Sequence, residues 1–298
     1  MRVAITGGSG FIGQYLCQEL FESGLTPVIL TRKATGNEKY EVIETNYSFE
    51  DLENKLKRID SLVHLASKRG SQGKILEFHE NEVLTQTIFD VCSKLNIKNI
   101  VNASTISVYS DQTELPWNEN SSIKPDLMYG ISKFTNECIA NVYSEKYKLN
   151  IKNLRIAHVF GFNEKNNYMV NKFMRQAYNK KMLQLNVPGE AKREFIYAKD
   201  VAKAIKLALH LPKSGTFNIG TGYALTNEEV ALSINEVFQN FGMLEILDVS
   251  GKEDIKSSYM TSQEALKVLD FTPSYSIEEA LEEIYKQMEE LEHVPELY

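Results

Sequence analysis

The sequence has few cysteines and no cluster of basic residues, and each absence excludes a class of binding site. Its three cysteines, Cys17, Cys92 and Cys138, lack the C-x-x-C spacing of metal and redox sites. We interpret them as small buried apolar residues in a reducing compartment, and we predict no disulfide and no metal site. The net charge is −7, without a concentration of Lys and Arg, so a nucleic-acid partner is not expected.

Long apolar runs are also missing. No run reaches the roughly 18 residues that a membrane-spanning helix needs. The chain enters a predicted strand at residues 3–5 without the apolar region of a signal peptide before it. These two absences predict a cytoplasmic protein without a membrane partner.

The first half alternates short apolar runs, typical of strands, with amphipathic stretches, typical of helices. The predicted strands are 2–5, 27–30, 41–43, 61–65, 99–103 and 152–156. The predicted helices are 12–23, 49–57, 81–95 and 129–147. This order predicts an α/β fold of the Rossmann type, with a doubly wound parallel sheet.

The second half has a different pattern, with predicted helices at 163–182, 227–241 and 276–292 and turns at 187–189, 220–222 and 272–273. We predict a dinucleotide-binding domain made of 1–162, to which 193–222 returns. The remaining residues, 163–192 and 223–298, are predicted to form a smaller, interleaved C-terminal substrate-binding domain.

A glycine-rich turn, Thr6–Gly13, follows the first predicted strand and opens the first helix. Gly8, Gly10 and Gly13 fit G-x-G-x-x-G, and Gly7, Gly10 and Gly13 also fit G-x-x-G-x-x-G. Glycines allow a tight turn and a close approach of the backbone to a pyrophosphate, which the helix N-terminus also attracts. The strand–turn–helix context predicts a dinucleotide site. The residues expected to contact the cofactor here are Gly7, Gly10, Phe11, Ile12 and Gly13.

The end of the second predicted strand, Thr31-Arg32-Lys33, bears on the choice of cofactor. A site that prefers NAD usually has a carboxylate here, which binds the adenosine ribose. This chain has two cations instead, which would suit the 2′-phosphate of NADP. We expect all three residues near the cofactor, with NAD as the cofactor and NADP as an open alternative.

Tyr129 and Lys133 form a Y-x-x-x-K pair, whose spacing places both side chains on one helix face. A free tyrosine has a pKa near 10, and a nearby cation lowers it toward the range of a useful base. Tyr168 and Lys172 match the same pattern. Because only Tyr129 follows a predicted strand that ends in Ser104-Thr105, we interpret Tyr168 and Lys172 as a surface pair.

Several motifs together resemble the extended short-chain dehydrogenase/reductases of the NAD-dependent epimerase/dehydratase group, which act on nucleotide sugars. Besides the turn and the Tyr129/Lys133 pair, the motifs are 60–66 (DSLVHLA), 104–109 (STISVY), 155–161 (RIAHVFG), 193–201 (REFIYAKDV) and 217–222 (FNIGTG). The resemblance covers nearly the whole chain. It implies a Rossmann domain, a smaller substrate domain and often a homodimer joined by helices such as 81–95 and 129–147.

The resemblance also implies roles for individual residues. Thr105 would orient the reacting sugar hydroxyl, Tyr129 would be the acid/base, and Lys133 would lower its pKa and hold the nicotinamide ribose. Further residues expected at the cofactor are Leu65, Ala66, Ser67, Asn81, Ser104, Ile156 and His158. Asn81 is equally well explained as a helix N-cap. Besides Thr105 and Tyr129, the residues expected at the substrate are Lys68, Arg193 at its pyrophosphate, Lys252, and Ser258 at a gate beside the sugar C2 substituent.

The two residues after Thr105 bear on the reaction. Related 4,6-dehydratases have an Asp-Glu pair there, decarboxylating relatives keep a glutamate, and 3,5-epimerase/4-reductases have a cysteine. Ile106 and Ser107 lack such acid/base groups. Hydride transfer at one carbinol remains, which predicts a 4-epimerase for UDP-glucose or UDP-N-acetylglucosamine. The alternatives are an NADPH-dependent reductase of nucleotide 4-ketosugars and a catalytically silent dinucleotide sensor.

Three positions depart from the pattern of the group. His158 stands where asparagine is usual, Phe162 replaces a common proline, and Gly251 falls where an arginine often contacts the nucleotide, with Lys252 beside it. These departures concern the nucleotide more than the hydride chemistry.

Overall fold

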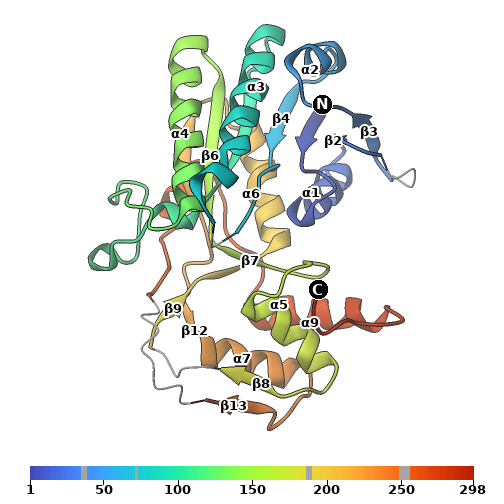
Figure 1. Cartoon of the computed structure of the whole chain (residues 1–298), viewed down its shortest axis with the longest axis vertical. Helices are drawn as coiled ribbons and strands as arrows, with labels where there is room; N and C mark the ends of the chain where they lie inside the picture. Colours follow the sequence, from blue (N-terminus) through green and yellow to red (C-terminus); the bar gives the residue numbers. More distant parts are fainter. Residues whose placement is uncertain (35–38, 71–72, 186–189, 248–255) are drawn as a thin grey trace.

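A computed structural model of the chain describes residues 1–34, 39–70, 73–185, 190–247 and 256–298. The chain forms two lobes, with a large sheet and its helices in the upper part of Figure 1 and a smaller group of helices and short strands below. Among the described residues, no helix combines the length and apolar character that a membrane span requires.

The larger lobe is built on a seven-stranded sheet with the order β11-β6-β5-β4-β1-β2-β3, in which all neighbours pair in parallel. Its strands are β1 (Arg2–Thr6), β2 (Thr26–Thr31), β3 (Glu41–Glu44), β4 (Ser61–His64), β5 (Asn99–Thr105), β6 (Asn150–Ile156) and β11 (Gly215–Ile219). The chain order reverses between β1 and β4, and ligands of such sheets bind beyond the carboxyl ends of the strands at this point. The predicted fold class is confirmed.

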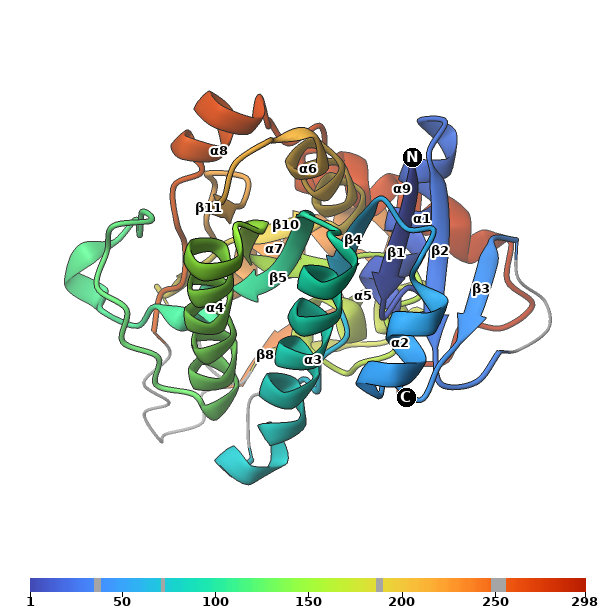
Figure 2. The same cartoon turned by 90° about the horizontal axis from the view of Figure 1, so that it is seen from above.

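Helices cover both faces of the sheet (Figure 2). Val3 and Ile5 of β1 pack in a core with α1 and α6, whereas Ala4 faces a second core with α2, α3 and α4. Because both faces are buried, the strands read as nearly continuous apolar runs. These helices are α1 (Phe11–Glu22), α2 (Phe49–Lys55), α3 (His79–Leu95), α4 (Met128–Tyr147) and α6 (Ala198–His210).

The smaller lobe has its own apolar core, which includes Phe173, Leu183, Ile234 and Ile284. Its elements are α5 (Met169–Tyr178), α7 (Asn227–Val237), α9 (Ile277–Glu289) and the parallel pair β8 (Leu183–Leu185) and β13 (Leu244–Ile246). The helix predicted at 163–182 is shorter than expected. Residues 163–168 form a loop instead, which begins with Asn163 at φ 68° and whose carbonyls at Glu164 and Asn166 bind the guanidinium of Arg175.

The two lobes are interleaved. Short strand pairs run between them: β7 (His158–Phe160) with β10 (Phe195–Tyr197), and β9 (Lys192–Arg193) with β12 (Leu225–Thr226). Met260, Ala265 and Phe271 then pack in the same core as Val3, so the segment around α8 (Gln263–Leu269) returns to the larger lobe. Short 3-10 helices complete the fold: η1 (Ile75–Glu77), η2 (Ile106–Val108) and η3 (Gln112–Glu114).

All three cysteines are free thiols, and two of them match the sequence prediction. Cys17 and Cys92 are buried, but the prediction is wrong for Cys138, which lies on the exposed side of α4. In the described part of the chain, no group of three or more His, Cys, Asp or Glu side chains is arranged to hold a metal ion.

Candidate active site

The glycine-rich turn is too tight for any other residue at two of its positions. Gly7 has φ 70°, and a Cβ on it would lie 2.9 Å from the backbone nitrogen of Ala66. A Cβ on Gly13 would lie 2.3 Å from the carbonyl oxygen of Gly7. Gly10 forms the N-cap of α1 without a side-chain cap, and the first turn carries no acidic residue. The backbone N–H groups of this turn therefore suit the pyrophosphate of a dinucleotide.

The loop after β4 is fixed against this turn by buried polar contacts. The hydroxyl of Thr6 accepts hydrogen bonds of 3.1 Å from the backbone nitrogens of both Leu65 and Ala66. His64 lies between two threonines, with Nδ1 2.7 Å from Thr6 Oγ1 and Nε2 3.1 Å from Thr85 Oγ1. Burial lowers the pKa of His64 to about 3, so the ring is neutral at physiological pH. The loops after β1 and β4 are thereby held together at the switch point of the sheet.

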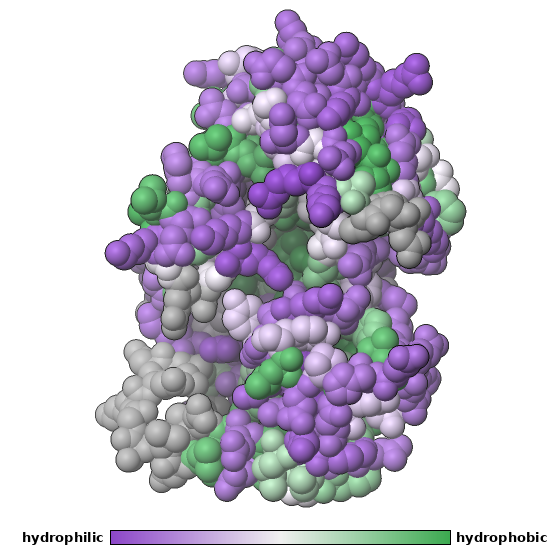
Figure 3. Space-filling model, turned by 45° about the vertical axis from the view of Figure 1, so that its right-hand side comes forward, coloured by the Kyte–Doolittle hydropathy of each residue, from purple (hydrophilic) through white to green (hydrophobic). Residues whose placement is uncertain are grey.

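A cavity of about 960 Å³ opens from this turn. The surface is hollowed between the upper and lower parts of the molecule, as Figure 3 shows. Most of the residues expected at the cofactor or substrate line it: Gly7, Gly10, Phe11, Ile12, Gly13, Leu65, Ala66, Ser67, Ser104, Thr105, Tyr129, Lys133, Ile156, His158, Arg193 and Ser258.

Other expected site residues lie outside this lining. Thr31 is the last residue of β2, and its hydroxyl forms hydrogen bonds with the backbone of Lys33. Arg32 and Lys33 follow it and are both exposed. Lys252 lies outside the described residues.

Asn81 and Lys68 differ from expectation. Asn81 is not the N-cap of α3, which is Phe78. It is buried in the first turn, where its amide accepts a 2.8 Å hydrogen bond from the backbone nitrogen of Lys68 and donates to Ser132. The ammonium of Lys68 lies 3.5 Å from Glu77, and this side chain does not line the cavity. Asn81 therefore acts on the cavity wall through the backbone at Lys68, and the Lys68 side chain lies away from the wall.

Thr105, Tyr129 and Lys133 meet in the cavity because β5 ends where α4 begins. Lys133 is buried and donates a 2.7 Å hydrogen bond to the carbonyl of Ala103. Burial lowers the pKa of Lys133 to about 8, although the carboxylates of Glu137 and Glu82 oppose the shift.

Tyr129 has a different electrostatic setting. Burial raises the pKa of its phenol to about 12, and the nearby phenol of Tyr168 adds to this. The guanidinium of Arg69 opposes the shift because a cation favours the phenolate. A base at Tyr129 therefore depends on cations in the cavity.

Gly130 brings the start of α4 against η2, which directly follows Thr105. A Cβ on Gly130 would lie 2.1 Å from the carbonyl oxygen of Ser107 and 3.0 Å from Cβ of Pro125. Thr105 Oγ1 in turn accepts a 3.2 Å hydrogen bond from the backbone nitrogen of Ser107. The missing side chain at Gly130 thus sets the separation between Tyr129 and Thr105.

A buried ion pair connects α4 to β6 next to these residues. The guanidinium of Arg155 binds the carboxylate of Glu137, one turn beyond Lys133, at 2.7 Å, and the hydroxyl of Ser104 donates to that carboxylate. Arg155 also donates a 2.6 Å hydrogen bond to the hydroxyl of Tyr109. This network ties β5, β6 and α4 together next to Thr105 and Lys133.

On the opposite wall, His158 and Ser258 form a polar pair beside Arg193. Nε2 of His158 lies 3.2 Å from Oγ of Ser258. Burial, with the nearby charge of Arg193, lowers the pKa of His158 to about 4, so the ring is neutral. This wall therefore presents one cation and two neutral hydrogen-bonding groups to the cavity.

The sequence did not predict that Arg69, Glu164 and Tyr168 line the cavity. Tyr168 is exposed, as a surface residue would be, but it lines the same cavity as Tyr129 and acts electrostatically on that phenol. For Arg69, the only signal was its place directly after the expected site residues 65–68. Glu164 gave no local signal because its partner is 95 residues away in the chain.

Comparisons with known proteins agree with this geometry. The model of the NAD dependent epimerase/dehydratase family matches residues 3–220. UDP-N-acetylglucosamine 4-epimerase from Bacillus cereus is 52% identical, with 100% of both chains covered and a TM-score of 0.94. UDP-glucose 4-epimerase from Thermotoga maritima, solved with UDP-glucose, shares the fold at 23% identity, with 97% of this chain and 99% of its own covered and a TM-score of 0.87.

Among curated proteins, the uncharacterized UDP-glucose epimerase YtcB of Bacillus subtilis is 28% identical, and the match covers 94% of this chain and 96% of its own. The family model alone spans more than half of the 298 residues, and its match includes the glycine-rich turn, Thr105, Tyr129 and Lys133. The chain therefore belongs to the NAD-dependent epimerase/dehydratase family.

Proposed function

We propose that the protein is a nucleotide-sugar 4-epimerase that uses NAD and acts on a UDP-hexose or UDP-N-acetylhexosamine. One observation carries the proposal: the cavity joins a dinucleotide cradle to Thr105, Tyr129 and Lys133, with no acid/base side chain at the two positions after Thr105. The 52% identity to a UDP-N-acetylglucosamine 4-epimerase supports the N-acetylhexosamine as the first substrate to test.

The bound cofactor would lie against the glycine-rich turn and Lys133, and it would reversibly accept the hydride from the sugar C4. The chain's own residues handle the proton. The phenolate of Tyr129 takes the proton of the 4-hydroxyl and later returns it to the oxygen at C4. Thr105 orients that hydroxyl, and the Lys133 ammonium adds the positive charge that favours the phenolate. The proposed reaction requires the ketosugar to turn over in the cavity between the two half-reactions, so that the hydride returns to the other face of C4.

The other ionisable groups of the cavity argue against elimination and ring-carbon deprotonation. Ile106 is buried and apolar, and Ser107 contacts Thr105. Among the described lining residues, the carboxylates are Asp126, which pairs with Lys256 at 3.3 Å, and Glu164, which pairs with Arg69. Both carboxylates are engaged in ion pairs and neither follows Thr105, so hydride chemistry at one carbinol fits the site best.

The opposite wall is proposed to bind the rest of the substrate. Arg193 lines the cavity and would hold the pyrophosphate, since a guanidinium matches phosphate oxygens. Ser258 is a small side chain beside His158, which leaves space for an N-acetyl group at the sugar C2. In this proposal residues 1–162 and 193–222 bind the cofactor, and residues 163–192 and 223–298 bind the substrate, although the segment around α8 packs on the larger lobe.

We further propose a homodimer formed through α3 and α4. Large apolar side chains on these helices are exposed, among them Val83, Val142 and Tyr147. Their exposure supports burial against a second copy of the chain. Sedimentation of the purified protein tests this, and a monomer at micromolar concentration would contradict it.

A specific feature favours a second function, an NADPH-dependent reductase of a 4-ketosugar. Arg32 and Lys33 are exposed directly after β2, at the position where a site that prefers NAD usually has a carboxylate. Two cations at this position would suit the 2′-phosphate of NADP. A reductase consumes NADPH in proportion to product, whereas an epimerase needs no added reductant.

Incubation of the purified protein with UDP-N-acetylglucosamine and with UDP-glucose, without reductant, tests the proposed function. We expect the 4-epimer of at least one, resolved by chromatography, and loss of the conversion in Tyr129→Phe. The absence of both epimers, with NADPH consumed on a 4-ketosugar, would favour the reductase. An unchanged rate in Tyr129→Phe would remove the proposed mechanism.

A further inference from the structure

We propose that Arg69 is a positioning residue for the proposed reaction: its guanidinium, fixed by Glu164, keeps a cation within electrostatic range of the Tyr129 phenol. Arg69 lies in the loop after β4 and Glu164 in the loop after β7, and both line the cavity. The two residues form a bidentate pair, with N–O distances of 2.8 and 3.2 Å. A planar guanidinium held at both ends of its fork has little freedom to turn away.

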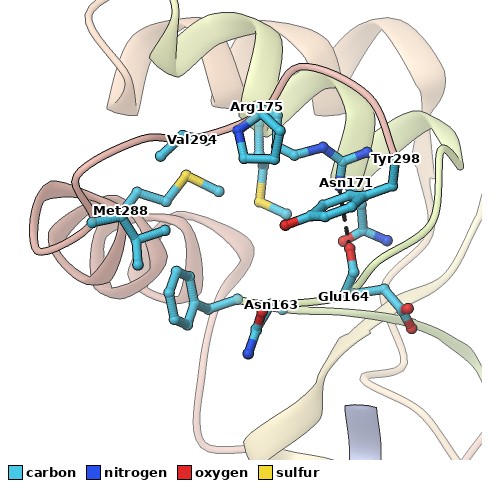
Figure 4. A pocket seen from close by; sticks show the side chains of 12 residues that line it. Asn163, Glu164, Asn171, Arg175, Met288, Val294 and Tyr298 are labelled. Atoms are coloured by element: carbon cyan, nitrogen blue, oxygen red, sulfur yellow. Dashed lines mark hydrogen bonds between the residues drawn. The ribbon is translucent and has the colours of Figure 1, made fainter. Parts of the chain in front are cut away.

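Glu164 is itself rigidly held, which makes it a suitable anchor. Its side chain is 3% exposed, although that of Arg69 is 55% exposed. Arg175 donates a 3.2 Å hydrogen bond to the Glu164 carbonyl and stacks on the ring of Tyr298, 5.0 Å from its centre. Figure 4 shows the Glu164 carboxylate pointing away from Arg175 and Tyr298, toward the other side of the loop. The backbone of Glu164 is thus fixed from one side while its carboxylate holds Arg69 on the other.

The charged and titratable groups around Tyr129 come from three elements. Arg69 faces it from the loop after β4, Tyr168 from the start of α5, and Lys133 lies one turn further along α4. The charge of Lys133 is partly balanced by Glu82 and Glu137. In the structure, Lys133 donates to the carbonyl of Ala103, and the cation that counters the burial of Tyr129 is Arg69.

This arrangement has a defined consequence for the proton transfer. The phenolate of Tyr129 is the form that accepts the proton of the sugar hydroxyl, and a nearby cation stabilises that form. Arg69 therefore works together with Lys133 and the cofactor to bring the pKa of Tyr129 down. Removal of one partly exposed charge at this range should shift the titration by roughly 0.5 to 1 pH unit.

The first experiment compares the pH dependence of kcat/KM for the wild type, Arg69→Gln and Arg69→Lys. We expect the acidic limb of the pH profile to move to higher pH by roughly 0.5 to 1 unit in Arg69→Gln. At pH values below the apparent pKa, this shift lowers kcat/KM about three- to tenfold. Arg69→Lys keeps the charge and should restore most of the limb. Lys165→Gln is the matched control, because it removes an exposed cation from the residue next to Glu164 and outside the cavity lining.

A second readout does not depend on turnover, so it separates this inference from the proposed function on which it rests. With 3-fluorotyrosine at position 129, the fluorine chemical shift of the cofactor-bound protein reports the titration of that phenol directly. We expect a higher pKa in Arg69→Gln than in the parent. If no UDP-sugar is interconverted, the proposed function fails, and this titration still decides the role of Arg69.

Loss of Arg69 leaves the Glu164 carboxylate buried without its partner, which destabilises the fold. The double variant Arg69→Gln with Glu164→Gln avoids that stranded charge and should show a smaller upward shift than Arg69→Gln, because it also removes the neighbouring negative charge. An unchanged acidic limb and an unchanged fluorine titration in folded Arg69→Gln would overturn the proposal. The same result with a lowered Tm would show that the pair serves stability alone.

Discussion

Gly130→Ala is the substitution that most directly tests the geometry of the catalytic pair. In an ordinary helix, this change stabilises a protein by about 1 kcal/mol, because alanine has the higher helix propensity. Here the new methyl group would lie 2.1 Å from the carbonyl oxygen of Ser107. Ordinary contact begins near 3.4 Å, so α4 and the loop after β5 would have to separate by about 1.3 Å.

Two effects follow from that separation. Overpacking of this kind costs about 1–3 kcal/mol, so the net change is a loss of stability and not a gain. A displacement of Tyr129 by about 1 Å from Thr105 is expected to lower kcat by roughly 100-fold. The clash is between the new methyl group and the backbone carbonyl oxygen of Ser107, so no side-chain rotation can relieve it.

Initial rates of UDP-sugar interconversion and thermal unfolding of the same preparations measure both effects. Thr135→Ala is the matched control, since it introduces alanine at an exposed position of the same helix. It should leave the rate unchanged. A Gly130→Ala protein that is more stable than the wild type and equally active would refute the close contact and its catalytic consequence.

Three further predictions follow. Tyr129→Phe should lower kcat by roughly 10²–10⁴-fold and retain the bound cofactor, measured by rate assay and by absorbance of the cofactor released on denaturation. Replacement of both Arg32 and Lys33 by alanine should weaken NADP about tenfold and leave the Kd of NAD nearly unchanged, in calorimetric titrations. His64 stays neutral in the folded state down to about pH 3, whereas the unfolded chain binds a proton near pH 6.5. Stability should therefore fall by roughly 3 kcal/mol from pH 7 to pH 4, and urea unfolding of His64→Gln should show a smaller loss.

The parts of the fold that the sequence predicted are those whose signals are local. The turn Thr6–Gly13 carries its strand, its glycines and its helix within one short segment, and the structure has all three. The six predicted strands of the sheet match observed strands to within two residues at each end. The family assignment is also confirmed, because many short motifs at the correct spacing are jointly specific.

The parts that were not predicted depend on contacts between distant segments. The short strands β8 and β13 pair residues about 60 positions apart, and neither has an apolar run long enough to be recognised. The helix α5 begins later than predicted because Arg175 binds the carbonyls of the preceding loop. Sequence periodicity does not report such a contact.

The site shows the same division. Thr105, Tyr129 and Lys133 were candidates because each belongs to a motif, and all three line one cavity, while their catalytic roles stay a prediction. Arg69 and Glu164 belong to no motif, and their pairing exists only once the two lobes are assembled. Lys68 was expected in the wall instead of Arg69, its neighbour. A shift of one residue along a loop reverses which side chain faces the cavity, and that direction is set by the Asn81 contact to the loop backbone.

The interleaving of the lobes determines how this molecule can be re-engineered. The chain leaves the sheet after β6, returns for α6 and β11, leaves again for α7, and comes back a second time around α8. No single splice point therefore exchanges the smaller lobe with that of a relative. After α8 the chain leaves once more for α9, so a functional chimera requires three grafted segments, which carry α5, α7 and α9, and it must keep the recipient's own Met260–Phe271 packing intact.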